Sequence, residues 1–190
     1  FNAFQPNGMM DVRSRSILDP DDRVMDRISK LNNDEIGYHI IKNLSQDGTE
    51  LSYNVEYTIL EVELAHPILP GGRTELCMSF KSQIPVQIRR SGRDNKEGIA
   101  YSMAQWYPKI AAYDSRGWHA NPYVAREFYA PWGQFDVSIT INKNYIIAAS
   151  GILENNNEIG YGYQDDLSID PKHNAEKLTW HFINKKAHDF

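Results

Sequence analysis

The sequence has little that would mark a cross-linked, membrane-spanning or nucleic-acid-binding protein. Its one cysteine, Cys77, excludes a disulfide within the chain, and its alternating surroundings predict a small packed residue. No apolar run approaches the roughly 20 residues that a membrane-spanning helix needs. The 25 acidic residues outnumber the 20 basic ones, for a net charge of -5. We therefore expect no nucleic-acid partner, because neutralising phosphates requires a basic face.

The motifs of common hydrolytic enzymes are also missing. The histidines form neither an H-E-x-x-H nor an H-x-H pattern, so no spacing for a zinc site is present. No G-x-S-x-G segment supplies a nucleophilic serine. We therefore predict no catalytic residue and no metal ligand in this chain. The histidines, to which we assign structural or surface roles, are His39, His66, His119, His173, His181 and His188.

Length and composition predict one packed domain. The 190 residues suffice for a single sizeable core, whereas two domains would each be thin. Hydrophobic residues make up 41% and aromatic residues 12%, which favours a packed body over disorder. We therefore take residues 1–190 as a single domain.

Alternating hydrophobic residues predict an antiparallel β protein. The segment 135–141, FDVSITI, places Phe, Val and Ile on one face and Asp, Ser and Thr on the other. The segment 74–84, TELCMSFKSQI, alternates in the same way. We also expect a strand-like run over 51–64, a buried strand over 144–153 and a last strand over 178–190. The chain is therefore predicted to be mainly β, a sandwich or a curved sheet.

One short helix is predicted near residues 20–31. Pro20 suits the first helical position, and the acidic residues after it suit the positive end of the helix dipole. Val24, Ile28 and Leu31 recur at helical spacing and should share one buried face.

The connection between residues 84 and 134 is long for a compact domain, and long ordered loops usually carry function. Its second half is dense in aromatic residues, which either fill a core or line a groove or interface. Composition leaves these two options open. An aromatic surface would also suit a carbohydrate-binding β-sandwich, because aromatic rings stack on sugars. The aromatic residues are Tyr101, Trp106, Tyr107, Tyr113, Trp118, Tyr123, Phe128, Tyr129 and Trp132.

A basic cluster formed by Arg89, Arg90 and Arg93 precedes this aromatic stretch. It predicts a solvated hairpin tip, with a carboxylate-binding or domain-docking patch as the alternative. Asp94 and Glu97 interrupt the cluster and weaken the alternative.

The segment GIAYSMAQWYPKIAAYDSRGWHANPYVAREFYAPWGQFDVSITINKNYIIAASG carries a pattern that goes beyond composition. It resembles the N-terminal domain of the zinc aminopeptidases that include aminopeptidase N and leukotriene-A hydrolase, the gluzincin metallopeptidases, and in particular a bacterial branch. With FNAFQPNG at the start and HDF at the end, the resemblance spans almost the whole chain and is weaker over residues 12–75. The matching positions, in order, are Ser102, Gln105, Pro108, Asp114, residues 135–141 and residues 145–151.

The resemblance implies a fold and a set of partners. The family's N-terminal domain is a saddle-like antiparallel β assembly that packs on a thermolysin-like catalytic domain. The zinc ligands lie in that catalytic domain, and its motifs are absent here. The chain would therefore bind no cofactor itself, would have its own catalytic domain as a partner, and would lack the first strands of its sheet. An exposed sheet edge seeks a partner strand, so a dimer of the chain through that edge is allowed. Family habit favours the cell envelope or the periplasm.

The resemblance also gives Gln105 a role. In the family, the glutamine or glutamate at this place accepts hydrogen bonds from the free amino end of a peptide, which selects removal of N-terminal residues. We therefore predict substrate binding by Gln105, Trp106 and Tyr107. Met103, Ala104 and Trp106 depart from the common family residues, which leaves the shape of the pocket open. A corner amide that bonds a backbone carbonyl is the alternative for Gln105.

Two hypotheses follow for the function. In the first, the chain is the non-catalytic substrate-recognition and scaffold domain of a zinc-dependent aminopeptidase. In the second, it is a free-standing β-sandwich module that binds carbohydrate or a protein partner.

Overall fold

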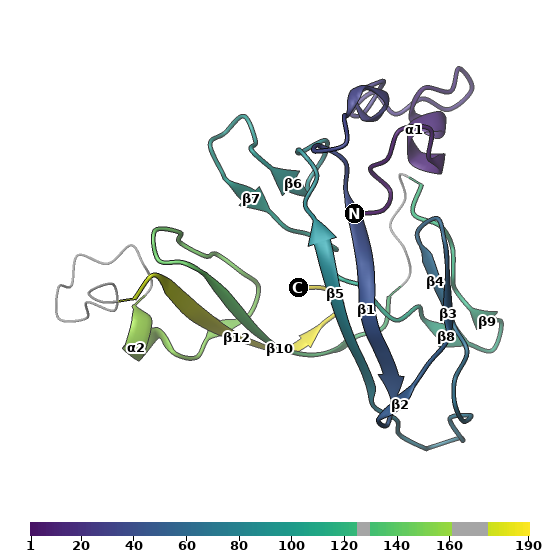
Figure 1. Ribbon diagram of the computed structural model, residues 1–190, viewed down its shortest axis with the longest axis vertical. Helices are drawn as coiled ribbons and strands as arrows, with labels where there is room; N and C mark the ends of the chain where they lie inside the picture. The colour runs from purple at the N-terminus through teal and green to yellow at the C-terminus, as the bar shows by residue number, and fades with distance from the viewer. Residues whose placement is uncertain (125–129, 161–174) are drawn as a thin grey trace. The chain divides into compact units, whose positions relative to one another are not determined.

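The computed structural model describes residues 1–124, 130–160 and 175–190, and within them the chain is mainly β, as predicted (Figure 1). Its strands pair antiparallel in several small sheets, and its helices are short. The contacts divide the chain into two compact units, Phe1–Tyr129 and Ala130–Phe190. The single domain expected from length stays a prediction.

The main sheet of the first unit is the antiparallel pair β1 (Tyr38–Gln46) and β5 (Leu76–Gln83), which run side by side in Figure 1. The short strand β2 (Thr49–Glu50) adds to the other edge of β1. Met78 and Phe80 of β5 are half-buried, and the residues that follow each of them are exposed. The alternation predicted over 74–84 is thus confirmed for this part of the strand.

A tight turn between β1 and β2 is clamped by side chains. Asp47 and Gly48 both have positive φ, 48° and 86°, as a two-residue hairpin turn requires. The fully buried Gln46 donates to the carbonyl of His66 and to Thr74 Oγ1, both at 3.0 Å. The Asp47 carboxylate accepts from the backbone N–H of Glu75 at 2.8 Å. These bonds hold the loop before β5 against the end of β1.

In the part of the first unit that the structure describes, the remaining strands form three small hairpins. The run predicted over 51–64 is a hairpin of two strands, because the chain reverses at Tyr57 (φ 53°) and Thr58. The strands, in hairpin pairs, are β3 (Tyr53–Glu56) with β4 (Ile59–Val62), β6 (Gly92–Arg93) with β7 (Tyr101–Ser102), and β8 (Tyr113–Asp114) with β9 (Gly117–Trp118).

The helix predicted over 20–31 does not form as an α-helix. Its residues make turns and a short 3₁₀ helix at Ile28–Lys30, because Met25 has a φ of 50° and interrupts the right-handed path. The α-helix of this region, α1 (Met9–Ser14), lies earlier in the chain. Val24 and Ile28 are nonetheless fully buried, so the predicted apolar face is confirmed for these two positions.

Within the described residues of the first unit, a cluster of buried apolar residues lies beneath α1 and the following turns, with Leu31 and Tyr123 packed against it. Its buried members are Ala3, Phe4, Met10, Val24, Ile28 and Ile88.

The second unit is built on β10 (Gly133–Asn142) and β12 (Lys177–Ala187), with β11 (Ile152–Leu153) along the other edge of β12. The alternation predicted over 135–141 is confirmed, since residues 135, 137, 139 and 141 are half-buried and the residues between them are exposed. The buried strand predicted over 144–153 is wrong: only its last two residues form a strand, β11, and Ile152 in it is 67% exposed. The turn at Tyr145 and the left-handed Gly151 (φ 95°) leave only β11 to pair.

The core of the second unit lies on one face of this sheet, where a short helix, α2 (Asn156–Ile159), follows β11. Trp180 is almost fully buried at its centre. Asn155 fixes α2 to the sheet, because its side chain donates to the carbonyl of Thr179 at 2.9 Å and accepts from the backbone N–H of His181 at 3.1 Å. The buried apolar residues are Ile159, Leu178, Trp180 and Phe182.

Cys77 is exposed on β5, so its prediction as a packed residue is wrong. Its Sγ donates to the carboxylate of Glu75 at 3.1 Å, and this hydrogen bond raises the pKa of the thiol. A raised pKa leaves little thiolate at neutral pH, so the thiol is a weak nucleophile. None of the helices in the described part of the chain is both long and apolar enough to cross a membrane.

His39 makes the stability of the first unit dependent on pH. Its ring stacks on Phe1, lies edge-on to Phe80, and bonds Ser82 Oγ through Nδ1 at 2.7 Å. Burial lowers the pKa of His39 from 6.5 to about 4. Between these values the unfolded chain binds more protons than the folded chain, so stability is complete above pH 6.5 and falls toward pH 4.

We predict that the substitution His39→Gln removes this part of the pH dependence. After allowance for solvent screening of a half-buried group, the loss in the wild type should be about 1–2 kcal/mol between pH 7 and pH 4. Urea unfolding of both proteins at pH 7, 5.5 and 4 measures the difference. Equal losses of unfolding free energy in the two proteins would contradict the role of His39.

Candidate functional site

The segment that contains the predicted site residues is reached through the β6–β7 pair. Gly92 has a φ of 147°, and a Cβ atom at this position would lie 2.4 Å from Cα of Gln87. Only glycine permits both this backbone conformation and this close approach. The approach brings Arg93 into hydrogen bonds with the backbone of residues 85 and 87. Strand β7 then runs alongside and leads into the site.

Ser91, which directly precedes β6, bonds the backbone of Ala104, the residue before Gln105. Its side chain is 4% exposed, and its hydroxyl donates to the carbonyl of Ala104 and accepts from the N–H of the same residue at 3.0 Å. Ser102 adds a second tie, because its Oγ donates to the carbonyl of Arg90 at 2.6 Å. The residue just before Gln105 therefore has both backbone groups held by one buried side chain.

Gln105 itself adopts a left-handed backbone conformation, with a φ of 55°. For a residue with a Cβ atom this conformation costs roughly 1–2 kcal/mol. Strained residues of this kind cluster at functional sites, where the surrounding structure holds them. The side chain is half-buried, so it is not sealed inside the unit.

Aromatic side chains follow Gln105 directly. Trp106 and Tyr107 are both half-buried and pack edge to face, with ring centroids 5.5 Å apart and an interplanar angle of 77°. The ammonium of Lys109 lies 5.8 Å from the centroid of the Tyr107 ring. The three predicted site residues are consecutive in the chain. The amide of Gln105 stands at one end, and the Tyr107 ring, with the ammonium of Lys109 against it, stands at the other.

The β8–β9 hairpin presents a second aromatic pair. The rings of Tyr113 and Trp118 lie 4.9 Å apart, and the two residues are 68% and 61% exposed. Asp114 stiffens the hairpin by accepting from the N–H of Arg116 and bonding His119 Nε2, both at 2.8 Å. The hydrogen bond from Arg116, with help from His119, lowers the pKa of the Asp114 carboxyl.

The structure gives the basic cluster internal partners. Arg89 donates to the hydroxyl of Tyr123 at 3.0 Å. Arg93 donates to the carbonyls of Ile84 at 3.3 Å and Asp34 at 2.8 Å. The interpretation as a solvated hairpin tip is therefore wrong for these two arginines, which join separate segments of the first unit.

No group of three or more metal-binding side chains comes together within residues 1–124, 130–160 and 175–190. His39, His66, His119 and His181 each have a protein partner there. Two of the aromatic residues and one of the histidines named from the sequence lie outside the described residues: Phe128, Tyr129 and His173.

Residues 105–107 were predicted from the sequence, whereas Ser91 was not. A buried serine that bonds a backbone 13 residues away leaves no local pattern, because serine is equally common in solvated turns. The left-handed conformation of Gln105 was also missed, since glycine and asparagine are the residues that normally indicate it.

Comparison of the chain with protein-family models, with curated proteins and with solved structures gives no match.

We predict that Ser91→Ala destabilises the protein, because it leaves the N–H and the carbonyl of Ala104 without their partner. The expected loss is about 1–3 kcal/mol of unfolding free energy. Ser115→Ala, in the exposed turn between β8 and β9, serves as a control and should change stability by less than about 0.5 kcal/mol. Urea unfolding of both variants measures the two free energies of unfolding. A Ser91→Ala variant as stable as the control would show that the hydrogen bonds between Ser91 and Ala104 do not stabilise the protein.

We also predict opposite responses to two substitutions of Gln105. Gln105→Gly relieves the left-handed strain and should leave stability unchanged or raise it by up to about 1 kcal/mol. Gln105→Val places a β-branched residue at positive φ and should lower stability by more than about 1 kcal/mol. Thermal unfolding measures both, and equal effects of the two substitutions would contradict the conformation.

Proposed function

We propose that the chain is the non-catalytic substrate-recognition and scaffold domain of a zinc-dependent aminopeptidase. Gln105, Trp106 and Tyr107 contact the free amino end of a peptide. The observation that carries the proposal is the strained and anchored conformation of Gln105, at the head of an aromatic pair and next to a backbone held by Ser91. This arrangement agrees with the order of residues that resembles the aminopeptidase family.

The chemistry of an amide suits this task. Its Oε1 accepts a charge-assisted hydrogen bond from an ammonium group, and such bonds are stronger than those between neutral groups. An internal peptide bond carries no ammonium, so it cannot supply this bond. Because the backbone of Ala104 is fixed, Gln105 pays little entropy to hold its position when a ligand binds.

The aromatic pair supports the same reading. The faces of tyrosine and tryptophan rings attract cations, but the ammonium of Lys109 already lies over the Tyr107 ring and would repel a second ammonium there, so the peptide's ammonium would contact Gln105 and Trp106. The edge-to-face contact fixes Trp106 and Tyr107 relative to each other. A peptide amino end would therefore meet an acceptor and a preformed aromatic wall.

The catalytic zinc ion of the proposed parent would polarise the scissile carbonyl and activate a water molecule. The described residues of this chain do not fit such an ion, because no suitable ligand group is present among them. Zinc would belong to a separate catalytic domain, and no step proposed for this chain runs through it.

We predict that the chain distinguishes peptides by their amino end. Titration with an alanine tripeptide amide should shift the NMR signals of the Gln105 side-chain amide and the Trp106 indole N–H in a saturable way. The N-acetylated form of the same peptide should leave them in place. Gln105→Ala should weaken binding of the free-amine peptide about tenfold or more, the loss expected for a hydrogen bond to a charged group.

Gln134→Ala provides the matched control, since this glutamine is exposed in the second unit. It should bind the free-amine peptide as the wild type does. Gln105 would not recognise a free amino end if the acetylated and free peptides bound equally well. The same conclusion would follow if the Gln105→Ala variant bound the free-amine peptide as tightly as the wild type does.

A second candidate function is that of a carbohydrate-binding module, and one observation favours it. Tyr113 and Trp118 are both largely exposed on a stiffened hairpin, as a platform for a sugar ring would require. Titration with mixed oligosaccharides separates the two functions. Shifts of the Trp118 indole signal with no response at Gln105 would favour carbohydrate binding over peptide recognition.

A further inference from the structure

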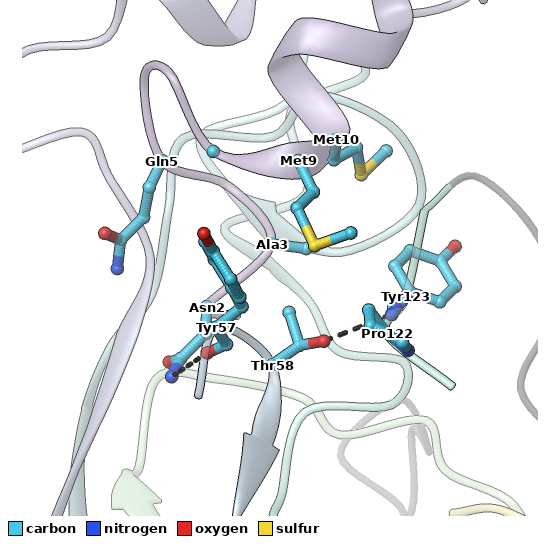
Figure 2. Close-up of a pocket in the computed structure, with 10 residues that line it drawn as sticks. Asn2, Ala3, Gln5, Met9, Met10, Tyr57, Thr58, Pro122 and Tyr123 are labelled. Carbon is cyan, nitrogen blue, oxygen red and sulfur yellow. Dashed lines mark hydrogen bonds between the residues drawn. The ribbon is translucent and has the colours of Figure 1, made fainter. Parts of the chain in front are cut away.

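The first unit contains a pocket away from the segment of Gln105. Three parts of the chain form it: the residues around α1, the turn of the β3–β4 hairpin, and residues 122 and 123. Figure 2 shows the side chains of Met9, Tyr57, Thr58 and Tyr123 arranged around the space beside Ala3.

Hydrogen bonds across the three parts keep the pocket open without a ligand. Asn2 Nδ2 donates to the carbonyl of Tyr57 at 3.3 Å, and the backbone N–H of Tyr123 donates to Thr58 Oγ1 at 3.1 Å (Figure 2). Gln5 Nε2 donates to the carbonyl of Gly37 at 3.1 Å. The walls are therefore fixed to one another, which reduces the entropy that a ligand must lose on binding.

The lining of the pocket selects an uncharged group. None of the described residues that line it is charged. Met10 and Ala3 are buried at its base, whereas Met9 and Tyr57 are 41% and 61% exposed at its mouth. The thioether side chains adapt to irregular apolar shapes. A charged ligand group would lose its hydration here without gaining a counter-ion.

The size of the pocket limits the ligand further. It encloses about 80 Å³, roughly half of the 150 Å³ cavity that holds a benzene molecule in another protein. This space accepts the side chain of valine, leucine or isoleucine. It is too small for a nucleotide or another large cofactor, since pockets for such ligands span about 300–1,000 Å³.

Tyr57 lines the pocket from a strained backbone position. It has a φ of 53° at the turn of the hairpin, a conformation that strains a bulky residue and that glycine would adopt freely. A turn selected for stability alone would carry glycine or asparagine at this position. Tyrosine gives up that stability and places an aromatic ring as one wall of the pocket (Figure 2).

We propose that this pocket binds the branched aliphatic side chain of a peptide segment. Among the lining residues, Tyr57 carries a hydroxyl that can donate to the carbonyl of a bound peptide. The site does not depend on the role of Gln105. It recognises an apolar side chain within a peptide and not a free amino end.

The test uses the full 190-residue chain labelled with ¹³C at the methionine methyl groups, and N-acetyl-leucinamide as the probe. The methyl signals of Met9 and Met10 should shift with a dissociation constant in the millimolar range, as expected for one buried side chain. The signals of Met25, Met78 and Met103 should stay in place. N-acetyl-glycinamide and N-acetyl-lysinamide should bind at least fivefold more weakly. Because the probes are acetylated, their binding is independent of the proposed recognition of a free amino end.

Tyr57→Gly separates binding from folding. It relieves the strained φ, so the variant should unfold at the same or a higher temperature, and it removes one wall, so binding should weaken at least fivefold. Val55→Ala on the same hairpin, exposed and outside the pocket, should bind as the wild type does. The proposal is overturned if Tyr57→Gly binds the probe normally, if the glycine analogue binds equally well, or if the Met9 and Met10 signals do not move.

Discussion

The hydroxyl of Ser91 bonds both backbone groups of Ala104, and the geometry of the candidate recognition segment follows from this contact. The contact exists because Gly92 lets the chain pass within van der Waals distance of Gln87, which no residue with a side chain would permit. A buried hydroxyl that satisfies a donor and an acceptor at once is costly to remove, since both groups would be left without partners. The position of Gln105 is thus set by packing some distance away along the chain, and not by the preference of glutamine.

The two candidate sites of the first unit share one structural feature, a strained backbone conformation that hydrogen bonds hold in place. Gln105 and Tyr57 are both non-glycine residues with positive φ. Gln105 directly precedes the aromatic pair Trp106 and Tyr107, and Tyr57 is itself an aromatic residue that lines the pocket. In each case hydrogen bonds from neighbouring segments compensate for the strain: Ser91 acts beside Gln105, and Asn2 bonds the carbonyl of Tyr57. Strain held in this way gives a rigid site, which binds a ligand with a smaller loss of entropy. The proposed functions differ, because one site offers an amide to an ammonium group and the other an uncharged pocket to an aliphatic side chain.

The sequence predicted those features that depend on local periodicity. The alternation over 135–141 identified β10, and the alternation over 74–84 identified β5, because one face of each strand is more buried than the other. Features that depend on single backbone angles were not predictable in this way. Met25 turns a helical pattern over 20–31 into turns and a 3₁₀ helix, and Gly151 leaves most of the apolar run over 144–153 outside the sheet. The site was predicted as a segment through family resemblance, whereas its anchor, Ser91, depends on a contact that no pattern in the sequence indicates.

Hydrogen exchange at the amide of Ala104 measures whether Ser91 holds the backbone before Gln105 rigid. This amide should exchange far more slowly than the amide of Lys96, which lies in an exposed turn. Ser91→Ala should remove the protection at Ala104 while the amides of β1 and β5 remain protected. Exchange at Ala104 as fast as at Lys96 in the wild-type protein would show that Ser91 does not hold this backbone, and Gln105 would then have no fixed position from which to recognise a ligand.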